Sequence, residues 1–276
     1  MPSQAEKGRL FKGRHAKPGI IILPNPWDAG TAKLLQSMGF EALATTSLGM
    51  SIALGRPDGE NAVSRAELIA NCRQIAAATD LPVNADLENG YADDPKQAAS
   101  ILREAAEAGI VAGSIEDWDG EKIYDFNHAV ERVVAGVEMA RSLPVPFTFV
   151  ARAEGYGRKV ESLDDTLKRL QAFEKAGADV LYAPHFRDIA TMKIAVSAVS
   201  KPLNVVMSAA DPSITVAEME AIGIRRVSVG GALARLAMAA FMKGAREMKH
   251  KGGFTWMRDA MSGKDLKAVF NAGKER

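Results

Sequence analysis

The chain has 276 residues, of which 47% are hydrophobic and 25% are charged, and its formal net charge is +1. This mixture is typical of a soluble globular protein, and the small net charge gives no long-range attraction to nucleic acid or to an anionic membrane. Cys72 is the only cysteine, which excludes an intrachain disulfide framework and a zinc site built from thiolates.

The first residues, MPSQAEKGRLFKGRHAKPG, contain no apolar segment of the kind that a secretory signal has. No stretch approaches the roughly 20 consecutive apolar residues of a transmembrane helix. We therefore expect a cytoplasmic protein with no membrane partner.

Eight short apolar runs follow one another along the chain, separated by amphipathic helical stretches. The runs are residues 20–23, 42–46, 82–86, 112–117, 147–152, 179–184, 202–206 and 226–230. Regular alternation of strand and helix predicts a parallel (β/α)8 TIM barrel. A doubly wound open sheet is the alternative, but Gly155-Tyr156-Gly157 lacks the third glycine of a dinucleotide-binding loop.

The helical stretches carry recognisable start and stop signals. Asp28 is a candidate N-cap, Ser64 begins an S-x-x-E capping box, and Asp94-Pro95 places proline in a first turn. Residues 48–61 and 117–127 are expected to be loops. We predict one domain over residues 1–276, in which residues 251–276 form a C-terminal helical extension whose apolar side chains pack on the barrel or on a neighbouring subunit.

Acidic residues end the third and fourth runs, where a barrel collects its catalytic groups. Asp86 and Glu88, at positions i and i+2, project to the same side of an extended backbone. Two carboxylates placed together repel unless a cation lies between them, and oxygen ligands favour Mg²⁺ or Mn²⁺. Glu116 ends the neighbouring run, and Asp58 lies in the loop GRPDGEN. The alternative is an N-cap with a solvent-facing acid.

Other polar residues follow other runs. Arg152 ends the fifth run, where a guanidinium suits a carboxylate or phosphonate group of a substrate; an ion pair with Glu154 or Glu116 is the alternative. His185 follows the sixth run. The small residues of Ser47-Leu48-Gly49 would let backbone N–H groups approach a carboxylate. No lysine ends any run, which argues against a Schiff-base aldolase.

Together these segments resemble the isocitrate lyase/phosphoenolpyruvate mutase superfamily. The resemblance covers nearly the whole chain and is carried by LPNPWDAGTAKLLQSMGFEALATTSLG, GRPDG, VNADLENGY, SIEDW, ARAEG and PLNVV. It implies a (β/α)8 barrel that assembles as a homodimer or homotetramer, often with an end helix exchanged between subunits.

The resemblance also implies roles for residues. Asp86 resembles the direct Mg²⁺ ligand, whereas Asp58, Glu88 and Glu116 act mostly through water. The carboxylate of a 2-oxo acid is held by the segment that matches Ser47, Leu48 and Gly49. The remaining candidates are Arg152 and Asn204 as substrate-binding residues and His185 as the counterpart of a mutase histidine.

The loop after the fourth run departs from the family pattern. Lyases for isocitrate and methylisocitrate carry a cysteine there, but this loop reads DWDGEKIYDFNHA. Lys122 matches the lysine that mutases and phosphonopyruvate hydrolases have in the loop, but their following asparagine-serine pair is missing. Lys122 and Tyr124 are the candidates for a proton donor.

The sequence therefore predicts a Mg²⁺-dependent lyase that cleaves a C–C bond of a small 2-oxo acid or related carboxylate, or decarboxylates it, through an enolate. Two alternatives stay open. One is C–P chemistry on a phosphonate, as in a phosphonopyruvate hydrolase or a carboxyphosphonoenolpyruvate mutase. The other is a barrel that binds a 2-oxo acid without converting it.

Overall fold

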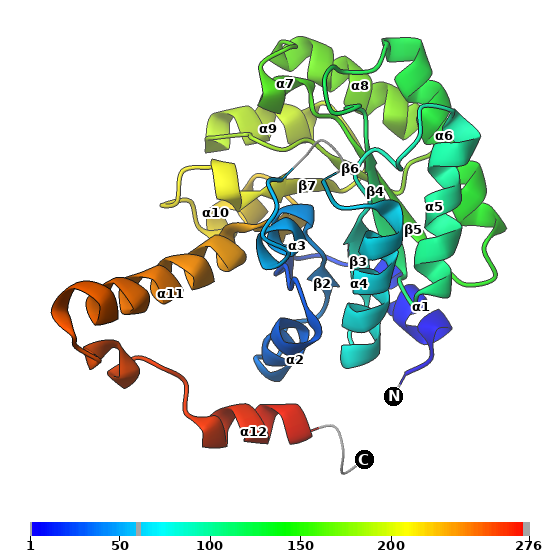
Figure 1. Ribbon diagram of the computed structural model, residues 1–276. Coiled ribbons are helices and arrows are strands. Elements are labelled where there is room, and N and C mark those ends of the chain that lie inside the picture. Colours follow the sequence, from blue (N-terminus) through cyan, green and yellow to red (C-terminus); the bar gives the residue numbers. More distant parts are fainter. Residues whose placement is uncertain (1, 59–61, 273–276) are drawn as a thin grey trace.

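The computed structural model describes residues 2–58 and 62–272. In this part of the chain, eight parallel strands form one sheet in the order β1-β8-β7-β6-β5-β4-β3-β2 (Figure 1). The backbone N–H of Ala44 donates to the carbonyl of Pro24, at 3.1 Å, and so links the two ends of the sheet. The strands are β1 Ile21–Leu23, β2 Leu43–Ala44, β3 Val83–Asp86, β4 Ala112–Glu116, β5 Thr148–Arg152, β6 Val180–Tyr182, β7 Leu203–Val206 and β8 Arg226–Ser228.

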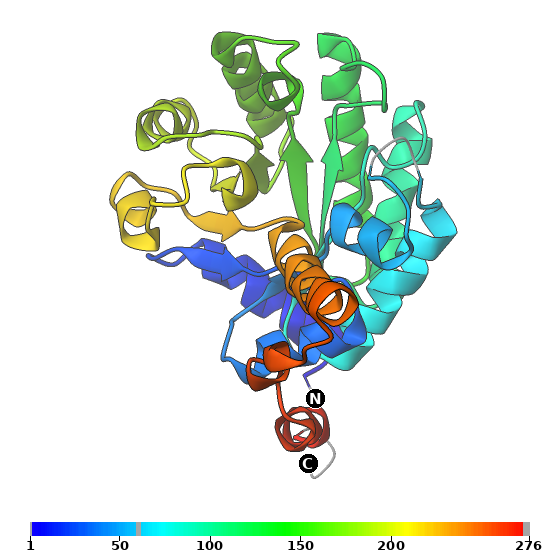
Figure 2. The same ribbon diagram turned by 60° about the vertical axis from the view of Figure 1, so that its left-hand side comes forward.

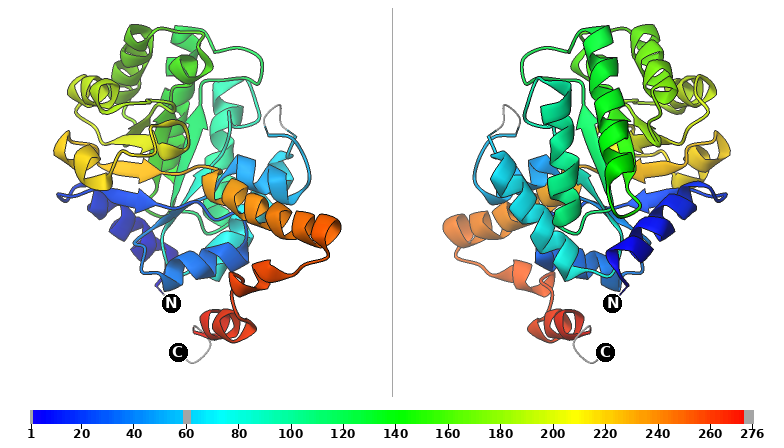
Figure 3. Two further views of the ribbon diagram at one scale, coloured as in Figure 1. Left: turned by 90° about the vertical axis from the view of Figure 1, so that its left-hand side faces the viewer. Right: turned by 90° about the vertical axis from the view of Figure 1, so that its right-hand side faces the viewer.

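Helices cover the outside of this nearly closed barrel, as Figure 3 shows from two sides. They follow the strands as α2 Ala29–Ser37, α4 Arg65–Ala78, α5 Pro95–Glu107, α6 Phe126–Ser142, α8 Leu163–Lys175, α9 Ile189–Ser197, α10 Val216–Ala221 and α11 Ala232–Lys251. Shorter pieces are α3 Ser47–Ala53, α7 Gly155–Arg158, η1 Met207–Ala209, η2 Thr255–Arg258 and α12 Gly263–Asn271. All eight predicted apolar runs contain a strand, so the strand prediction is confirmed.

The predicted helix caps are confirmed. The side chains of Asp28 and Ser64 each form a capping box, and Asp94 caps the helix that begins at Pro95. Gly109 follows the end of α5 with a φ of +93°, a conformation that glycine adopts without steric cost. These local signals place each helix so that the next strand returns to the sheet.

Two helices lie where the sequence did not predict them. Residues 47–53 form α3 instead of a loop, because the Thr46 side chain accepts a hydrogen bond from the Gly49 N–H and caps this helix. An additional helix, α1 Gln4–His15, lies at the end of the barrel where the strands begin (Figure 1). Its Phe11 is 1% exposed and belongs to an apolar cluster with Ile21 and Leu23. Phe11 therefore closes this end of the barrel.

The C-terminal helices leave the barrel. Helix α11 extends away from it, η2 lies beside α11, and α12 returns to lie against α2 (Figures 1 and 2). Trp256 packs on Gly244 of α11, whereas Phe254 and Met257 are 59% and 62% exposed in the single chain. Among the described residues, no helix is long and apolar enough to span a membrane.

His15 gives the stability of this fold a defined pH dependence. Burial, together with the positive charge of Arg226, lowers the pKa of His15 to about 4. In the unfolded chain His15 takes up a proton below its ordinary pKa of about 6.5, so between these values the unfolded state binds more protons than the folded state. The contribution of His15 to the free energy of unfolding should therefore fall as the pH drops from 6.5 to 4, by at most about 3 kcal/mol.

Urea unfolding at several pH values tests this expectation. In His15→Phe this contribution should be lost, so lowering the pH between these two values should destabilise the variant less than the unmodified chain. His250→Phe, on an exposed position of α11, should leave the dependence as in the unmodified chain. An unchanged slope in His15→Phe would contradict the assignment.

Candidate active site

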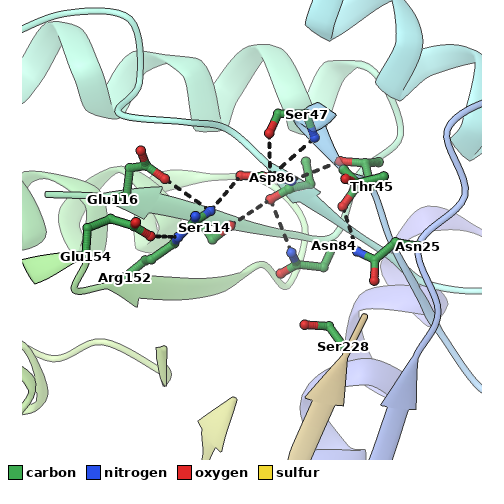
Figure 4. A network of polar contacts seen from close by, with 12 residues as sticks. Asn25, Thr45, Ser47, Asn84, Asp86, Ser114, Glu116, Arg152, Glu154 and Ser228 are labelled. Carbon is green, nitrogen blue, oxygen red and sulfur yellow. Dashed lines mark hydrogen bonds and ion pairs between the residues drawn. The ribbon is translucent and has the colours of Figure 1, made fainter. Parts of the chain in front are cut away.

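The carboxyl ends of β3, β4 and β5 bring two carboxylates and a guanidinium together. Glu116 pairs with Arg152 in the strand register, and Asp86 pairs with Ser114. The Nη1 atom of Arg152 lies 3.3 Å from Oδ1 of Asp86 and 3.1 Å from Oε2 of Glu116 (Figure 4). On its other side, Nε of Arg152 contacts Oε1 of Glu154. One cation thus serves three carboxylates.

Helix α3 supplies a further contact to this cluster. The Ser47 backbone N–H and hydroxyl both donate to Oδ2 of Asp86, at 3.4 and 3.2 Å. The backbone N–H of Asp86 in turn donates to the Thr45 hydroxyl, at 2.9 Å. Both Asp86 oxygens are therefore held in a fixed direction by groups from two other elements.

Glu88 joins the cluster through a backbone conformation that the sequence did not predict. The strand ends at Asp86, and Glu88 has a φ of +51°, so the extended geometry expected for the two residues is wrong. Its side chain nevertheless lies close by. Burial raises the pKa of Glu88 to about 7, and the negative charges of Asp86 and Asp58 add to this effect. Asp58 is thus near enough to act on the same group.

Burial dominates the electrostatics of the other members. It raises the pKa of Glu116 well above the ordinary range, although the charge of Arg152 opposes this shift. Burial also disfavours the charge on Arg152, but Glu116 and Glu154 more than offset it, so the pKa of this arginine lies above its usual range. Asp86, Glu88, Glu116 and Glu154 outnumber the two arginines that contact the cluster, Arg152 and Arg158, which suits an additional cation.

Glu154 is the member of the site that the sequence analysis named only as a possible ion-pair partner. It is 1% exposed, it contacts Arg152, and it also pairs with Arg158 at 3.3 Å. Its backbone N–H donates to Oδ1 of Asp117, at 2.8 Å. The ARAEG segment contained the signal, because an acid two positions after a buried arginine is well placed to fix its direction.

His185 lies beside the cluster of carboxylates around Arg152. Its φ is +73°, and a Cβ atom on Gly157 of α7 would meet its ring at 2.3 Å, so this close packing requires glycine. Burial lowers the pKa of His185, with opposing effects from the charges of Glu154 and Arg152. This shift favours the neutral imidazole, and the effects of Glu154 and Arg152 place His185 near the cluster.

Four other candidates do not contact the carboxylates in this structure. Lys122 is exposed, and its backbone forms the Asp119 turn. Asn204 points into the barrel, where its amide bonds Ser228 and Arg226. The Gly49 N–H is used by the α3 cap, and Leu48 packs on Gly231.

The donor set determines which metal the site suits. Among the described residues, no three His, Cys, Asp or Glu side chains lie together closely enough to hold an ion by themselves. The available donors at this mouth are carboxylate and hydroxyl oxygens. Mg²⁺ keeps several of its waters and needs only one or two protein carboxylates, so these residues fit a hydrated Mg²⁺ ion.

Comparison with known proteins agrees with this geometry. The family model described as phosphoenolpyruvate phosphomutase matches residues 11–249. The chain therefore belongs to this family, within the isocitrate lyase/phosphoenolpyruvate mutase superfamily, and the resemblance noted in the sequence is confirmed.

Individual relatives are similar over most of the chain. A crystal structure from Burkholderia cenocepacia J2315, provisionally described as a lyase/mutase, is 47% identical with a TM-score of 0.94, covering 98% of this chain and 97% of that one. An uncharacterized Mycobacterium tuberculosis protein is 32% identical over 80% of this chain and 81% of its own length. A 2,3-dimethylmalate lyase of Eubacterium barkeri is 29% identical over 59% of this chain and 58% of its own length.

The fold is also shared with a more distant hydrolase. The structure of a phosphonopyruvate hydrolase in complex with oxalate and Mg²⁺ is 20% identical, with a TM-score of 0.85, and covers 98% of this chain and 96% of that one. At this identity the similarity shows the barrel fold alone. The curated relatives with similar sequences include a 2-methylisocitrate lyase of Bacillus subtilis as well as the 2,3-dimethylmalate lyase.

Proposed function

We propose that this protein is a Mg²⁺-dependent lyase that cleaves a C–C bond of a small 2-oxo acid or related carboxylate, or decarboxylates it, through an enolate. The observation that carries the proposal is the contact of Arg152 with both Asp86 and Glu116, beside the N–H and hydroxyl of Ser47. This places a guanidinium, hydrogen-bond donors and buried oxygen ligands within one small volume.

Asp86 would hold Mg²⁺ directly, and Asp58, Glu88 and Glu116 would hold it through water, with Mn²⁺ as a possible substitute. Bound there, the ion would supply several kcal/mol of stabilisation to an oxyanion. Supporting this assignment, the phosphonopyruvate hydrolase that shares the fold was crystallised with Mg²⁺ and oxalate.

The protein's own groups would position the substrate. Ser47 presents donors for the substrate carboxylate, and Arg152, kept in place by Glu154, orients the distal or departing carboxylate. The segment from Trp118 to Phe126 begins as a hairpin, in which Trp118 bridges to Ile123, and we propose that it excludes water from the site.

Two residues of this hairpin are candidates for delivering a proton. The Tyr124 hydroxyl donates to Asp93 at 2.7 Å, and burial raises its pKa to about 12. The proton of the Tyr124 hydroxyl is therefore already engaged in a hydrogen bond, whereas the side chain of Lys122 is exposed near the hairpin tip. This difference favours Lys122.

Thiol chemistry is not part of the proposal. Cys72 lies in α4 and is 1% exposed, and burial raises its pKa to about 12. A thiolate is the reactive form of cysteine, so this residue fits a core position.

C–P chemistry is the second candidate, favoured by the match to a phosphoenolpyruvate phosphomutase model. The same cation and arginine would serve a phosphonate as well as a carboxylate. The two reactions differ in their products, because hydrolysis of phosphonopyruvate releases inorganic phosphate and lyase chemistry on a carboxylate does not.

Removing the central carboxylate should remove both metal binding and turnover. In Asp86→Asn, we expect Mg²⁺ affinity measured by calorimetry to fall at least tenfold, because the direct ligand loses its charge, and lyase activity to be lost. The matched control is Asp164→Asn, an exposed acid in the first turn of α8. Unchanged Mg²⁺ binding in Asp86→Asn would refute the metal site.

A panel of 2-oxo acids, 2-hydroxy acids and phosphonopyruvate separates the candidate reactions. We expect Mg²⁺-dependent conversion of a carboxylate substrate, inhibition by oxalate as an enolate mimic, and no phosphate from phosphonopyruvate. Phosphate release would favour the C–P alternative. Tight oxalate binding with no conversion of any compound would indicate a binding protein.

The proposal includes assembly into a homodimer or homotetramer through the C-terminal helices, with exchange of an end helix between subunits. Helix α11 exposes Leu236 and Phe241 to 65% and 68%, and Met261 near α12 is 51% exposed. Apolar surface of this size on one helix is typical of a protein–protein interface.

Charge on the exposed face of α11 should therefore break the assembly. We expect Leu236→Glu together with Phe241→Glu to yield monomers in size-exclusion chromatography with light scattering. Lys243→Gln, on the same helix, should keep the oligomer. A monomer from the unmodified chain would contradict this part of the proposal.

A further inference from the structure

A second charged region lies at the opposite end of the barrel, where the strands begin. A cavity of about 430 Å³ opens there, formed by the end of α1, the end of α9 and the residues around the starts of β7 and β8. This volume is in the range of small-molecule sites. The described residues that line it include the cations Lys17, Lys201 and Arg225 and no carboxylate.

These three cations form no ion pair within the described residues. Three carboxylates lie near the cavity. Glu220 lies beside Gly19, and Asp179, which pairs with Arg141, acts on His15. The oxygens of Glu174 accept hydrogen bonds from the Ser200 hydroxyl and from the backbone N–H groups of Ser200 and Lys201. Among the described residues, none of these carboxylates forms an ion pair with a cation that lines the cavity.

Helix carbonyls do not neutralise it either. At the end of α1, the carbonyls of Gly13 and Arg14 accept hydrogen bonds from the backbone N–H groups of Ala16 and Lys17. At the end of α9, the carbonyls of Ala195 and Val196 are used in the same way by the two residues that follow Ser197. The partial negative charge of both helix ends is thus largely taken up.

A buried cation behind the cavity adds to the field. Arg226 is 2% exposed, its Nε donates to Oδ1 of Asn204, and its Nη1 has no partner among the described residues. Its charge acts on His15, which lines the cavity. A buried charge without an ion-pair partner is unfavourable, so an anion in the cavity would also stabilise the charge of Arg226.

His15 determines which anion fits. Its Nδ1 lies 2.8 Å from the carbonyl oxygen of Phe11. The carbonyl can only accept, so Nδ1 carries the ring hydrogen and Nε2 of the neutral ring presents a lone pair. This Nε2 atom is buried and has no partner among the described residues. A ligand that contacts Nε2 should therefore carry a hydrogen-bond donor.

We propose that this cavity binds a phosphate-type oxyanion that also carries a hydroxyl group. Its charged oxygens accept from Lys17, Lys201 and Arg225, and its hydroxyl donates to Nε2 of His15. Inorganic phosphate and a small polyol phosphate share this chemistry, whereas sulfate has no hydrogen to donate at neutral pH. The site is separate from the carboxylate cluster and stands whether or not the protein is a lyase.

Calorimetry with the full chain at pH 7 and constant ionic strength tests the site, using inorganic phosphate, glycerol 3-phosphate and sulfate as probes. We expect one or both phosphates to bind about tenfold more tightly than sulfate, the effect of one added hydrogen bond to a buried acceptor. Tighter binding of glycerol 3-phosphate would identify an ester as the ligand, and tighter binding of inorganic phosphate would identify the free anion.

Substitutions assign the roles. Lys201→Met with Arg225→Met should weaken all three anions about tenfold, because both act through charge. Lys193→Met, on α9 but outside the cavity, should change nothing. His15→Phe should remove the preference for phosphate over sulfate, with thermal unfolding used to verify that this variant is folded.

Three results would overturn the proposal. They are the absence of phosphate binding at millimolar concentrations, equal affinity of the unmodified chain for the phosphates and sulfate, and undiminished binding in the Lys201→Met, Arg225→Met double variant. None of the three depends on whether His15→Phe folds.

Discussion

The mouth of this barrel depends on one constraint, which is that buried carboxylates must be compensated by positive charge. Asp86, Glu116 and Glu154 all contact Arg152, and the three come from β3, β4 and the loop after β5. Removing water makes each of these contacts stronger and each unpaired charge more costly. Arg152 therefore fixes the relative positions of three strand ends as well as the chemistry of the site.

The rigidity of this arrangement comes from ordinary elements of the fold. Glu116 and Arg152 are register partners in adjacent strands, so the sheet itself sets their separation. Asp86 is held by Ser47 at the start of α3 and by Thr45 before it. Glu154 is fixed through its backbone by Asp117, which also pairs with the buried Arg169 at 3.4 Å. Groups placed on strands and helix ends in this way are held more precisely than groups on long loops.

Much of this could be predicted from the sequence, and the exceptions have physical causes. Strands and caps were predictable because apolar runs and capping residues act locally. Helix α1 carries the same kind of start signal, a capping box of Ser3 and Glu6, but it was not predicted because its buried positions are few and Phe11 is fixed by distant strands. The cluster of Asp86, Glu116 and Arg152 was predictable from strand ends, whereas the φ of +51° at Glu88 depends on the packing of its loop. The direction of the Asn204 side chain could not be predicted from a sequence motif, because tertiary contacts inside the barrel determine it.

A net charge of +1 conceals local clusters of charged side chains at the two ends of the barrel. The end where the strands finish gathers Asp86, Glu88 and Glu116 around one arginine, whereas the end where they begin gathers Lys17, Lys201 and Arg225 around an open cavity. Fields from such clusters fall off within about 10 Å in salt, so the two ends act independently on small charged molecules. The net charge therefore does not predict which ligands a barrel of this size attracts. The local charge at each of its two ends is the better guide.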